Sequence, residues 1–237
     1  MNDKKEWIYE RFDCLPSTQE YARGKQAEGK NLIVSAKCQT GGMGTKGRSF
    51  SSEIGGVYLS KLSFYDEGEF PASEAFLVMA NTASAVCEVL QSYGFNPVIK
   101  WANDIHIDGK KVCGILTENR FLGRFLRSSI VGIGLNLNNP LPQELEGIAT
   151  TALLSSGKAI SVDEAEARLI EALSKKRGME EYLRFVGYMG SEADLIIGDK
   201  RVSGRLLSVD ERGNLIAEVD GEVKRLASAE VSVRLKG

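Results

Sequence analysis

The 237-residue sequence has few of the residues on which several kinds of functional site depend. His106 is the single histidine, which largely excludes Ser-His-Asp triads and metal sites built from several histidines. The cysteines are widely spaced and include no Cys-x-x-Cys pair, so neither a zinc site nor a disulfide framework is indicated. We therefore predict no protein-built metal centre, and buried thiols in a reducing cytosol at Cys14, Cys38, Cys87 and Cys113.

Long apolar runs and a strong charge of one sign are also missing. No apolar run approaches the roughly 20 residues that a membrane-spanning helix needs, and residues 1–6 lack the apolar core of a signal peptide. The formal net charge is −2 and the isoelectric point is near 5.7, so no overall positive field attracts nucleic acid. These absences predict a cytoplasmic globular protein that binds neither membranes nor specific DNA.

What the sequence does contain is a group of charges within a predicted β-hairpin. Lys100, Asp104 and Lys111 lie among β-branched residues typical of short strands, which a turn at Asp108–Gly109 joins. Charged side chains that enter a sheet interior need a partner or a ligand. Two converging lysines suit a substrate with several negative charges, and Asp104 would offset one of them or hold a metal ion. The alternative is an exposed hairpin whose lysines are solvated.

A glycine-rich loop follows the predicted strand Asn31–Gln39. Gly41, Gly42, Gly44 and Gly47 allow the backbone to approach a ligand and to present N–H groups to it. The spacing is not that of a Walker motif, which ends in Gly-Lys-Ser/Thr. A structural turn and a ligand-binding loop that closes over substrate are both consistent with this segment.

In order, these segments resemble the sequence blocks of the biotin protein ligase family. The matching blocks are Ser17–Gln19 for the family's Ser-Thr-Asn, Gln39–Arg48 for its Gly-Arg-Gly-Arg-Arg-Gly-Arg loop, Lys100–Asp104 for Lys-Trp-Pro-Asn-Asp, Lys111–Leu116 for Lys-x-x-Gly-Ile-Leu, and Val131–Asn136 for Gly-Ile-Gly-Ile-Asn. Leu195–Lys200 is similar to the start of the family's small C-terminal barrel. The resemblance runs from about residue 8 to the end of the chain.

The resemblance implies an α+β fold with two domains. Residues 1–187 would form the catalytic domain, a mixed β-sheet with flanking helices of the class II synthetase-like biotin and lipoate ligase type. Residues 188–237 would form a small SH3-like β-barrel packed directly on it. Neither end of the sequence leaves room for the N-terminal helix-turn-helix module of the family's repressors, so a monofunctional ligase is expected.

The residue patterns predict the elements of this fold. Strands are expected at Trp7–Cys14, Asn31–Gln39 and Val57–Phe64, followed by three more strands through Asn138. Ser17 is a candidate N-cap for a helix to about Gly29, although capping and ligand contact are both open for it. Longer helices are expected at Ser73–Tyr93 and Val162–Phe185. Turn signals separate short strands at Asp194–Ile197, Lys200–Val209, Leu215–Val219, Glu222–Ala227 and Val231–Arg234.

The activity that the resemblance implies has two steps and uses ATP and biotin as substrates. Biotin's carboxylate attacks the α-phosphate of ATP to give biotinyl-5′-AMP, and a lysine of an acceptor protein then takes the biotin. The resemblance assigns catalytic roles to Lys111, Lys100, Asp104 and Arg48, with Mg²⁺ on the ATP phosphates and few direct protein ligands to it.

The remaining site residues divide between the two substrates. By resemblance, biotin is bound by Ser17, Thr18, Gln19, Gln39, Gly42, Met43, Gly44, Thr45, Lys111, Gly114 and Gly132, and ATP by Lys46, Arg48, Phe50, Asn103, Asn136 and Arg234. For Arg234, a solvated terminal charge is the alternative. The sequence departs from the family at Met43 and Thr45, which replace arginines, and at Phe50, Ala102 and Gln19, which replace Trp, Pro and Asn.

Two other functions stay open at this point. A lipoate or octanoate ligase or transferase shares the catalytic architecture, and a non-catalytic biotin or nucleotide sensor would account for the arginine-poor loop. The implied protein partner is a biotin carboxyl carrier domain of a biotin-dependent carboxylase. The oligomeric state, monomer or homodimer, is not decided by the sequence.

Overall fold

The computed structural model describes residues 6–197, 200–227 and 231–235, and in these ranges the chain forms a seven-stranded and a five-stranded β-sheet. The larger sheet consists of β1 (Trp7–Leu15), β2 (Asn31–Gln39), β3 (Val57–Phe64), β4 (Val98–Lys100), β5 (Asp104–Ile107), β6 (Lys110–Leu122) and β7 (Phe125–Leu135). Its order is β1-β2-β3-β7-β6-β5-β4, with β1 parallel to β2 and the other neighbours antiparallel. The predicted mixed sheet is confirmed.

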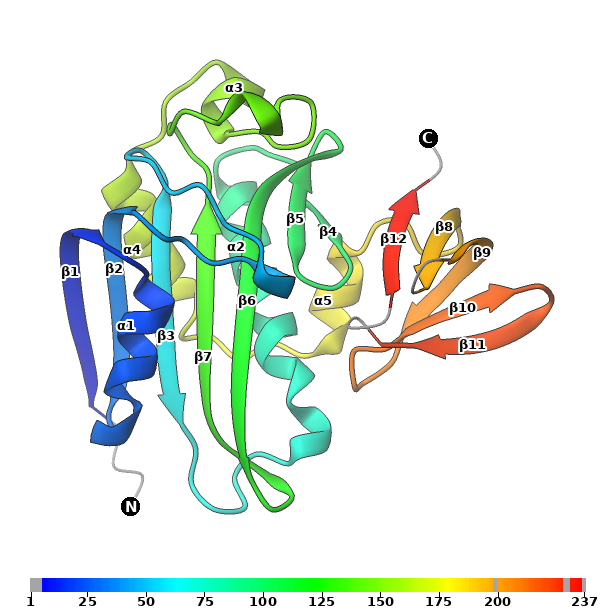
Figure 1. The fold of residues 1–237 in the computed structure, drawn as a ribbon, viewed down its shortest axis with the longest axis horizontal. Coiled ribbons are helices and arrows are strands. Elements are labelled where there is room, and N and C mark those ends of the chain that lie inside the picture. The colour runs from blue at the N-terminus through cyan, green and yellow to red at the C-terminus, as the bar shows by residue number, and fades with distance from the viewer. Residues whose placement is uncertain (1–5, 198–199, 228–230, 236–237) are drawn as a thin grey trace.

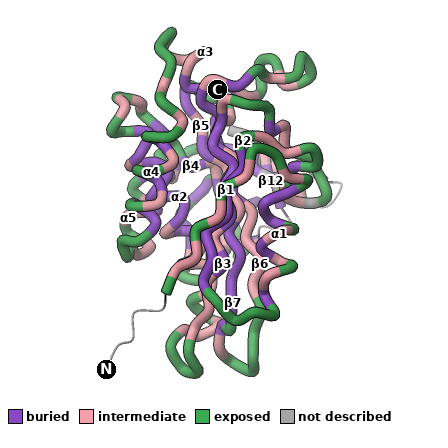
Figure 2. Tube along the Cα trace, turned by 90° about the vertical axis from the view of Figure 1, so that its left-hand side faces the viewer, coloured by how far each residue is buried: buried purple, intermediate pink, exposed green. Residues whose placement is uncertain are grey.

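Helices cover both faces of this sheet, as Figure 1 and the side view in Figure 2 show. One face carries α1 (Thr18–Gly24) with the 3₁₀ helix η1 (Lys25–Glu28), and the long loop between β2 and β3, which includes η2 (Thr45–Gly47). The other face carries α2 (Phe76–Ser92), preceded by η3 (Ala72–Glu74), together with α4 (Val162–Ala172) and α5 (Met179–Phe185). The links between β7 and α4 contain η4 (Gln143–Leu145) and α3 (Ala152–Ser156).

The main hydrophobic core lies between the sheet and α2. Met79, Ala83, Val86 and Leu90 follow one another at helical spacing and are all buried, and Phe76, at the start of the same stripe, is partly buried against the core. By length and composition the segment Ala72–Ser92 could cross a membrane, contrary to the expectation of no such run. In the structure 56% of its most apolar window is buried inside the protein, so its apolar character is that of a core helix.

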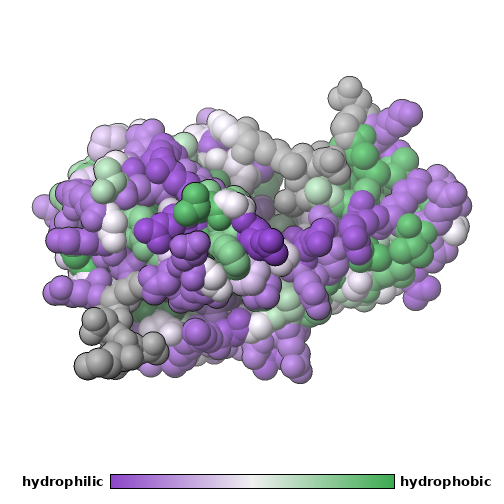
Figure 3. Space-filling model, turned by 90° about the horizontal axis from the view of Figure 1, so that it is seen from below, coloured by the Kyte–Doolittle hydropathy of each residue, from purple (hydrophilic) through white to green (hydrophobic). Residues whose placement is uncertain are grey.

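The smaller sheet is built from the five predicted C-terminal strands. These are β8 (Glu192–Ile197), β9 (Lys200–Val209), β10 (Leu215–Val219), β11 (Glu222–Leu226) and β12 (Val231–Leu235), in the order β11-β10-β9-β8-β12. Its buried side chains, such as Leu195 and Leu215, belong to the same core cluster as those of α2. Seen from below in Figure 3, exposed apolar residues gather over this sheet, where Leu207 and Val223 are solvent-exposed.

The segment between α2 and β7 differs from the prediction in its number of strands. From the end of α2 through β7 the described residues form four strands, β4 to β7, where three were expected through Asn138, because Lys100 and Asp104 pair across a very short connection. The hairpin turn between β5 and β6 lies at Asp108–Gly109, as predicted, with φ of 50° and 75°. Positive φ at both central turn positions matches the twist of the flanking strands.

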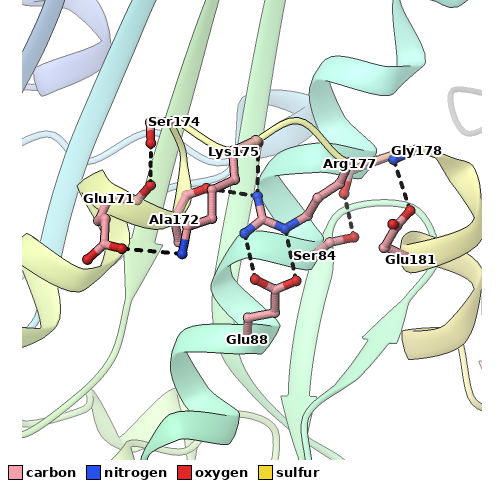
Figure 4. A network of polar contacts seen from close by, with 10 residues as sticks. Ser84, Glu88, Glu171, Ala172, Ser174, Lys175, Arg177, Gly178 and Glu181 are labelled. Carbon is pink, nitrogen blue, oxygen red and sulfur yellow. Dashed lines mark hydrogen bonds and ion pairs between the residues drawn. The ribbon is translucent and has the colours of Figure 1, made fainter.

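The predicted helix Val162–Phe185 is wrong, because the chain breaks into α4 and α5. The connection between them is held by Arg177, whose guanidinium makes two hydrogen bonds to Glu88 on α2, at 2.9 and 2.5 Å, and a third to the carbonyl of Ala172 (Figure 4). Gly178 then starts α5, and Glu181 accepts its backbone N–H. Residues 174–178, Ser-Lys-Lys-Arg-Gly, contain no apolar residue and end in a glycine, and this interruption was the available sequence signal for the break.

The prediction of four buried thiols is wrong for two cysteines. Cys14 and Cys38 are directly paired on the parallel strands β1 and β2, with Cα atoms 4.8 Å apart, and form a disulfide. Cys14 is exposed and Cys38 half-buried. Cys87 and Cys113 are buried free thiols, as predicted, and burial raises the pKa of both. Strand register, which brings Cys14 beside Cys38, is not visible in a spacing of 24 residues.

A thiol titration tests this disulfide. Denatured, unreduced protein is expected to show two free thiols, and four after reduction. The matched control Cys14→Ser releases Cys38 and should show three under both conditions. Closing a loop of this length stabilises by about 3 kcal/mol in the chain-entropy model, so reduction should lower the free energy of unfolding by a similar amount. Four thiols in the unreduced protein would contradict the pairing.

Candidate active site

A pocket lies on the sheet face that carries α1 and the β2–β3 loop. Most of the predicted site residues line it, and they come from segments that are far apart in the sequence. Those that line the pocket are Ser17, Thr18, Gln19, Gln39, Met43, Gly44, Thr45, Phe50, Asn103, Lys111, Gly114 and Gly132. The structure adds lining residues that the sequence reasoning did not assign, namely Ser60, Ile115, Leu116, Ile133 and Gly134.

The floor of the pocket is free of side chains where two strands cross it. Gly114 on β6 pairs with Gly134 on β7, and Gly132 lies two residues along β7 on the same face. A Cβ at Gly134 would lie 2.4 Å from the Phe50 ring, and one at Gly114 would lie 3.0 Å from the Lys111 ammonium. The alternation of Gly132 and Gly134 was the available signal, since residues i and i+2 share a face of a strand.

The charged end of the pocket is formed by Lys111 and its neighbours. The ammonium nitrogen of Lys111 lies 2.7 Å from Oδ1 of Asp104, and the Lys111 side chain is 28% exposed. Asn103 donates to the carbonyl of Ile115 at 2.9 Å and thereby joins the segment before β5 to β6. Asp104 therefore offsets the charge of Lys111, which is one of the two roles that the sequence left open for it.

The opposite end of the pocket is polar and uncharged. The backbone N–H of Thr18 donates to Oε1 of Gln39 at 2.8 Å, and the Thr18 hydroxyl lies 2.9 Å from that of Ser60. The Ser60 hydroxyl in turn lies 3.2 Å from Oε1 of Gln19. Ser17 caps α1, because its hydroxyl accepts the N–H of Glu20 at 3.4 Å, and it also lines the pocket.

Behind Gln19 stands an ion pair that the sequence reasoning missed. Arg23, one turn further along α1, donates to both carboxylate oxygens of Glu118 on β6, at 3.0 and 2.7 Å. Gln19 donates its amide N–H to the same carboxylate at 3.0 Å. The hydrogen bond from Arg23, with a smaller one from Gln19, lowers the pKa of Glu118. Arg23 follows Gln19 by four residues, a helical spacing that could have suggested a shared partner.

The arginine-poor loop lies over the mouth of the pocket. Arg48 is exposed and does not line the pocket; its guanidinium donates to the carbonyl and the hydroxyl of Thr45, at 3.3 and 3.2 Å. The loop is closed by a bridge between Met43 and Ser49. The side chain of Lys46, predicted to contact ATP, lies outside the described residues, so its role stays a prediction.

Several other predicted site residues do not line the pocket. Lys100 is the register partner of Asp104 on β4, one strand further from the floor. Gly42 is buried, and a Cβ there would meet the carbonyl of Phe50 at 2.3 Å, so it serves the path of the loop. Asn136 is buried and bonded to Thr150 and Asn139. The side chain of Arg234 is outside the described part of the chain.

Comparison with known proteins places this arrangement in a family. Residues 11–136 match the biotin/lipoate A/B protein ligase family. The chain is 31% identical to the Bacillus subtilis protein named bifunctional ligase/repressor BirA, covering 93% of this chain and 72% of that protein. The chain belongs to the biotin/lipoate A/B protein ligase family. The Escherichia coli BirA protein is 28% identical over the same shares of the two chains.

Solved structures of ligases in this family have the same fold. A biotin protein ligase from Aquifex aeolicus, in complex with biotin and ATP, matches 98% of this chain and 100% of its own, with a TM-score of 0.74 and 27% identity. The fold class inferred from the sequence, a catalytic mixed sheet followed by a small C-terminal β-sheet unit, is therefore confirmed for this family member. The exact boundary at residues 187 and 188 stays a prediction.

Proposed function

We propose that this protein is an ATP-dependent biotin protein ligase, which forms biotinyl-5′-AMP and transfers the biotin to a lysine of a biotin carboxyl carrier domain. The order of groups along one pocket carries the proposal. Amide and hydroxyl groups lie near Gly132, the glycine floor follows, and Lys111 lies near Gly114, about 7 Å further along the strands. Biotin has the same order: a cyclic urea, an apolar ring and chain, and a carboxylate.

The ligands of a structural neighbour agree with this assignment. The Aquifex aeolicus ligase, whose fold this chain shares, was solved with both biotin and ATP. A lipoate or octanoate ligase would need an apolar tunnel for its acyl chain, whereas Thr18, Ser60, Gln19 and Gln39 make one end of this pocket polar. A pocket with few, well-placed polar groups is typical of sites that recognise one small molecule.

The first chemical step joins two anions. A carboxylate oxygen of biotin attacks the α-phosphorus of ATP, and pyrophosphate leaves. Cationic groups must offset the charge that develops on the phosphate in the transition state. We assign this role to the Lys111 ammonium, which Asp104 holds at the end of the pocket. Arg48 and Lys100 are proposed to contact the phosphates after the loop closes.

The second step transfers the acyl group. The amine of the acceptor lysine attacks the acyl carbon of biotinyl-5′-AMP, and AMP leaves. The attacking amine must lose a proton, and Asp104 is the carboxylate nearest to Lys111 that we propose as its acceptor. Phe50 and Asn103, which line the pocket, and Lys46, Asn136 and Arg234 are the proposed nucleotide contacts.

The residues at the charged end of the pocket fit an Mg²⁺ ion that is bound mainly by the phosphates of ATP. Among the described residues no group of three or more His, Cys, Asp or Glu side chains is placed to hold a metal ion. Mg²⁺ commonly binds through phosphates, water and one or two carboxylates, and Asp104 is the carboxylate at this end of the pocket. When bound, the ion would neutralise phosphate charge.

An ATP–pyrophosphate exchange assay tests the proposed function. Biotin, octanoate and lipoate are compared as acyl substrates at equal concentrations. Biotin is expected to support exchange at a kcat/KM at least a hundredfold above the other two. A preference for octanoate or lipoate would favour the acyl ligase alternative, and biotin binding without exchange would favour a sensor.

The loss of the family's loop arginines predicts a leaky intermediate. Thr45 has a neutral side chain whose hydroxyl accepts a hydrogen bond from Arg48. An arginine at this position, as in the family, would offer a guanidinium with fixed, paired donors to the intermediate. Thr45→Arg is expected to slow dissociation of biotinyl-5′-AMP by about tenfold, the value of one charge-assisted hydrogen bond of about 1.5 kcal/mol. Release is measured by stopped-flow fluorescence, together with biotin incorporation into a bystander protein. The neutral control Thr45→Gln should release the intermediate as the wild type does; equal release by Thr45→Arg would contradict the prediction.

A further inference from the structure

The polar end of the pocket contains a continuous row of four side chains. Oε1 of Gln39 accepts the Thr18 hydroxyl at 3.1 Å, the hydroxyls of Thr18 and Ser60 lie 2.9 Å apart, and Ser60 lies 3.2 Å from Oε1 of Gln19. Gln19 and Thr18 are each 3% exposed and Ser60 is fully buried. The row therefore has to satisfy its hydrogen bonds from within or from a ligand in the pocket.

The row has too few hydrogens for its own contacts. Thr18 and Ser60 each bring one hydroxyl hydrogen, and the backbone N–H of Thr18 brings a third, which Oε1 of Gln39 accepts at 2.8 Å. These three hydrogens serve four contacts, and each oxygen of the row has two lone pairs. If Thr18 donates to Gln39 and Ser60 donates to Thr18, Oε1 of Gln19 receives no hydrogen from the row. In any other arrangement a different contact is left without one. The row is thus rich in acceptors and matches a ligand that brings N–H donors.

Glu118 determines which end of the Gln19 amide faces this row. An ionised carboxylate accepts hydrogen bonds and cannot donate them. Because Nε2 of Gln19 donates to Glu118 at 3.0 Å, its carbonyl oxygen must face Ser60 and the pocket. Arg23 holds the carboxylate by two charge-assisted hydrogen bonds, which favour the ionised form.

The Gln39 amide at the other end of the row is oriented in the same way. The Ser52 hydroxyl donates to the carbonyl of Phe50 at 3.0 Å. Its oxygen is therefore left to accept Nε2 of Gln39, at 2.8 Å. Each glutamine thus has an acceptor behind it, and both carbonyl oxygens point into the row.

We propose that Glu118, anchored by Arg23, is a positioning residue that holds the Gln19 amide with its carbonyl toward the pocket, so that the site selects a head group with N–H donors. The cyclic urea of biotin is such a group, and the inference rests on the proposed function for that ligand. Glu118 acts through Gln19 and touches no substrate. A structural ion pair between α1 and β6 would stabilise the protein without affecting ligand choice.

A double-mutant cycle on biotin binding separates these two roles. Dissociation constants are measured by calorimetry for the wild type, Glu118→Ala, Gln19→Met and the double variant. Glu118→Ala is expected to weaken binding about five- to tenfold, since it frees the amide to turn. In the Gln19→Met background the same change should have an effect below twofold, because the amide is already gone.

Two further variants keep the test specific. Glu118→Gln retains a carbonyl oxygen toward Arg23 and Gln19, and should bind biotin within about threefold of the wild type. Glu118→Leu occupies a similar volume but has no hydrogen-bond acceptor. It should weaken biotin binding as much as Glu118→Ala does, which shows that the loss of affinity does not come from looser packing of α1. Glu164→Ala breaks a comparable Arg–Glu pair with Arg168 on α4, far from the pocket, and should leave biotin affinity unchanged.

The outcomes distinguish this inference from the proposed function. If the wild type binds biotin and Glu118→Ala weakens binding equally in both backgrounds, Glu118 does not act through Gln19 and the inference is overturned. If the wild type binds no biotin, the proposed function fails and the inference fails with it. Thermal melts of every variant show whether a change in affinity follows a change in stability; a Glu118→Ala loss matched by Glu164→Ala would also overturn the inference.

Discussion

Replacing Lys111 by alanine is expected to lower kcat for biotinyl-5′-AMP formation by about 10²–10⁴-fold, the range for loss of one donor to developing charge. Among the described side chains that line the pocket Lys111 is the cation, and the Asp104 carboxylate lies 2.7 Å from its ammonium. At about 4 Å a unit charge pair is worth roughly 1 kcal/mol in water but about 4 kcal/mol at an effective dielectric of 20. In the partly enclosed site, the attraction between the Lys111 ammonium and a phosphate charge is therefore stronger than it would be in water.

The effect should fall on turnover more than on binding. The ammonium meets charge that develops in the transition state, so kcat should decrease more than biotin affinity does. Pyrophosphate exchange gives kcat, and calorimetry gives the dissociation constant of biotin. Lys110→Ala is the matched control, because Lys110 is the exposed neighbour on the same strand. Near-normal turnover by Lys111→Ala would mean that the active site is elsewhere.

Replacing Trp101 by alanine is expected to lower the free energy of unfolding by about 3–5 kcal/mol, as for other large buried aromatic residues. Trp101 is 6% exposed and belongs to the core cluster shared by the two sheets. Its indole N–H donates to the carbonyl of Gly213, in the turn between β9 and β10 of the smaller sheet, at 3.0 Å, and Tyr188 accepts its backbone N–H. The free energy of unfolding of a whole domain is about 5–15 kcal/mol, so the expected loss is a large fraction of the total stability.

The same substitution should also impair catalysis, because Trp101 anchors the segment that carries Lys100, Asn103 and Asp104. Urea unfolding followed by circular dichroism measures the stability. Trp101→Phe keeps most of the apolar contact and loses the hydrogen bond to Gly213, so a decrease of about 1–2 kcal/mol is expected for this control. A decrease below 1 kcal/mol for Trp101→Ala would show that the two sheets do not depend on this contact.

Local patterns were sufficient to predict most elements of the fold. Strands β2 and β3 begin and end at the predicted residues, and the turn between β5 and β6 lies at Asp108–Gly109 as predicted. Helix α2, Phe76–Ser92, lies within the predicted range Ser73–Tyr93. Each of these features depends on residues close together in the sequence, where periodicity and turn chemistry are direct physical signals.

The sequence by itself determined the fold class, the family and most of the residues that line the pocket. The reason is that these residues lie within short motifs, whose residue types and spacing can be recognised locally. Tertiary structure alone decided three other features: the Cys14–Cys38 pairing, the anchoring of the α4–α5 connection by Arg177 and Glu88, and the support of Gln19 by Glu118. All three depend on side chains that are brought together by strand register or helix packing. Such contacts join residues 24 to 99 positions apart, at distances of a few ångströms that no local pattern encodes.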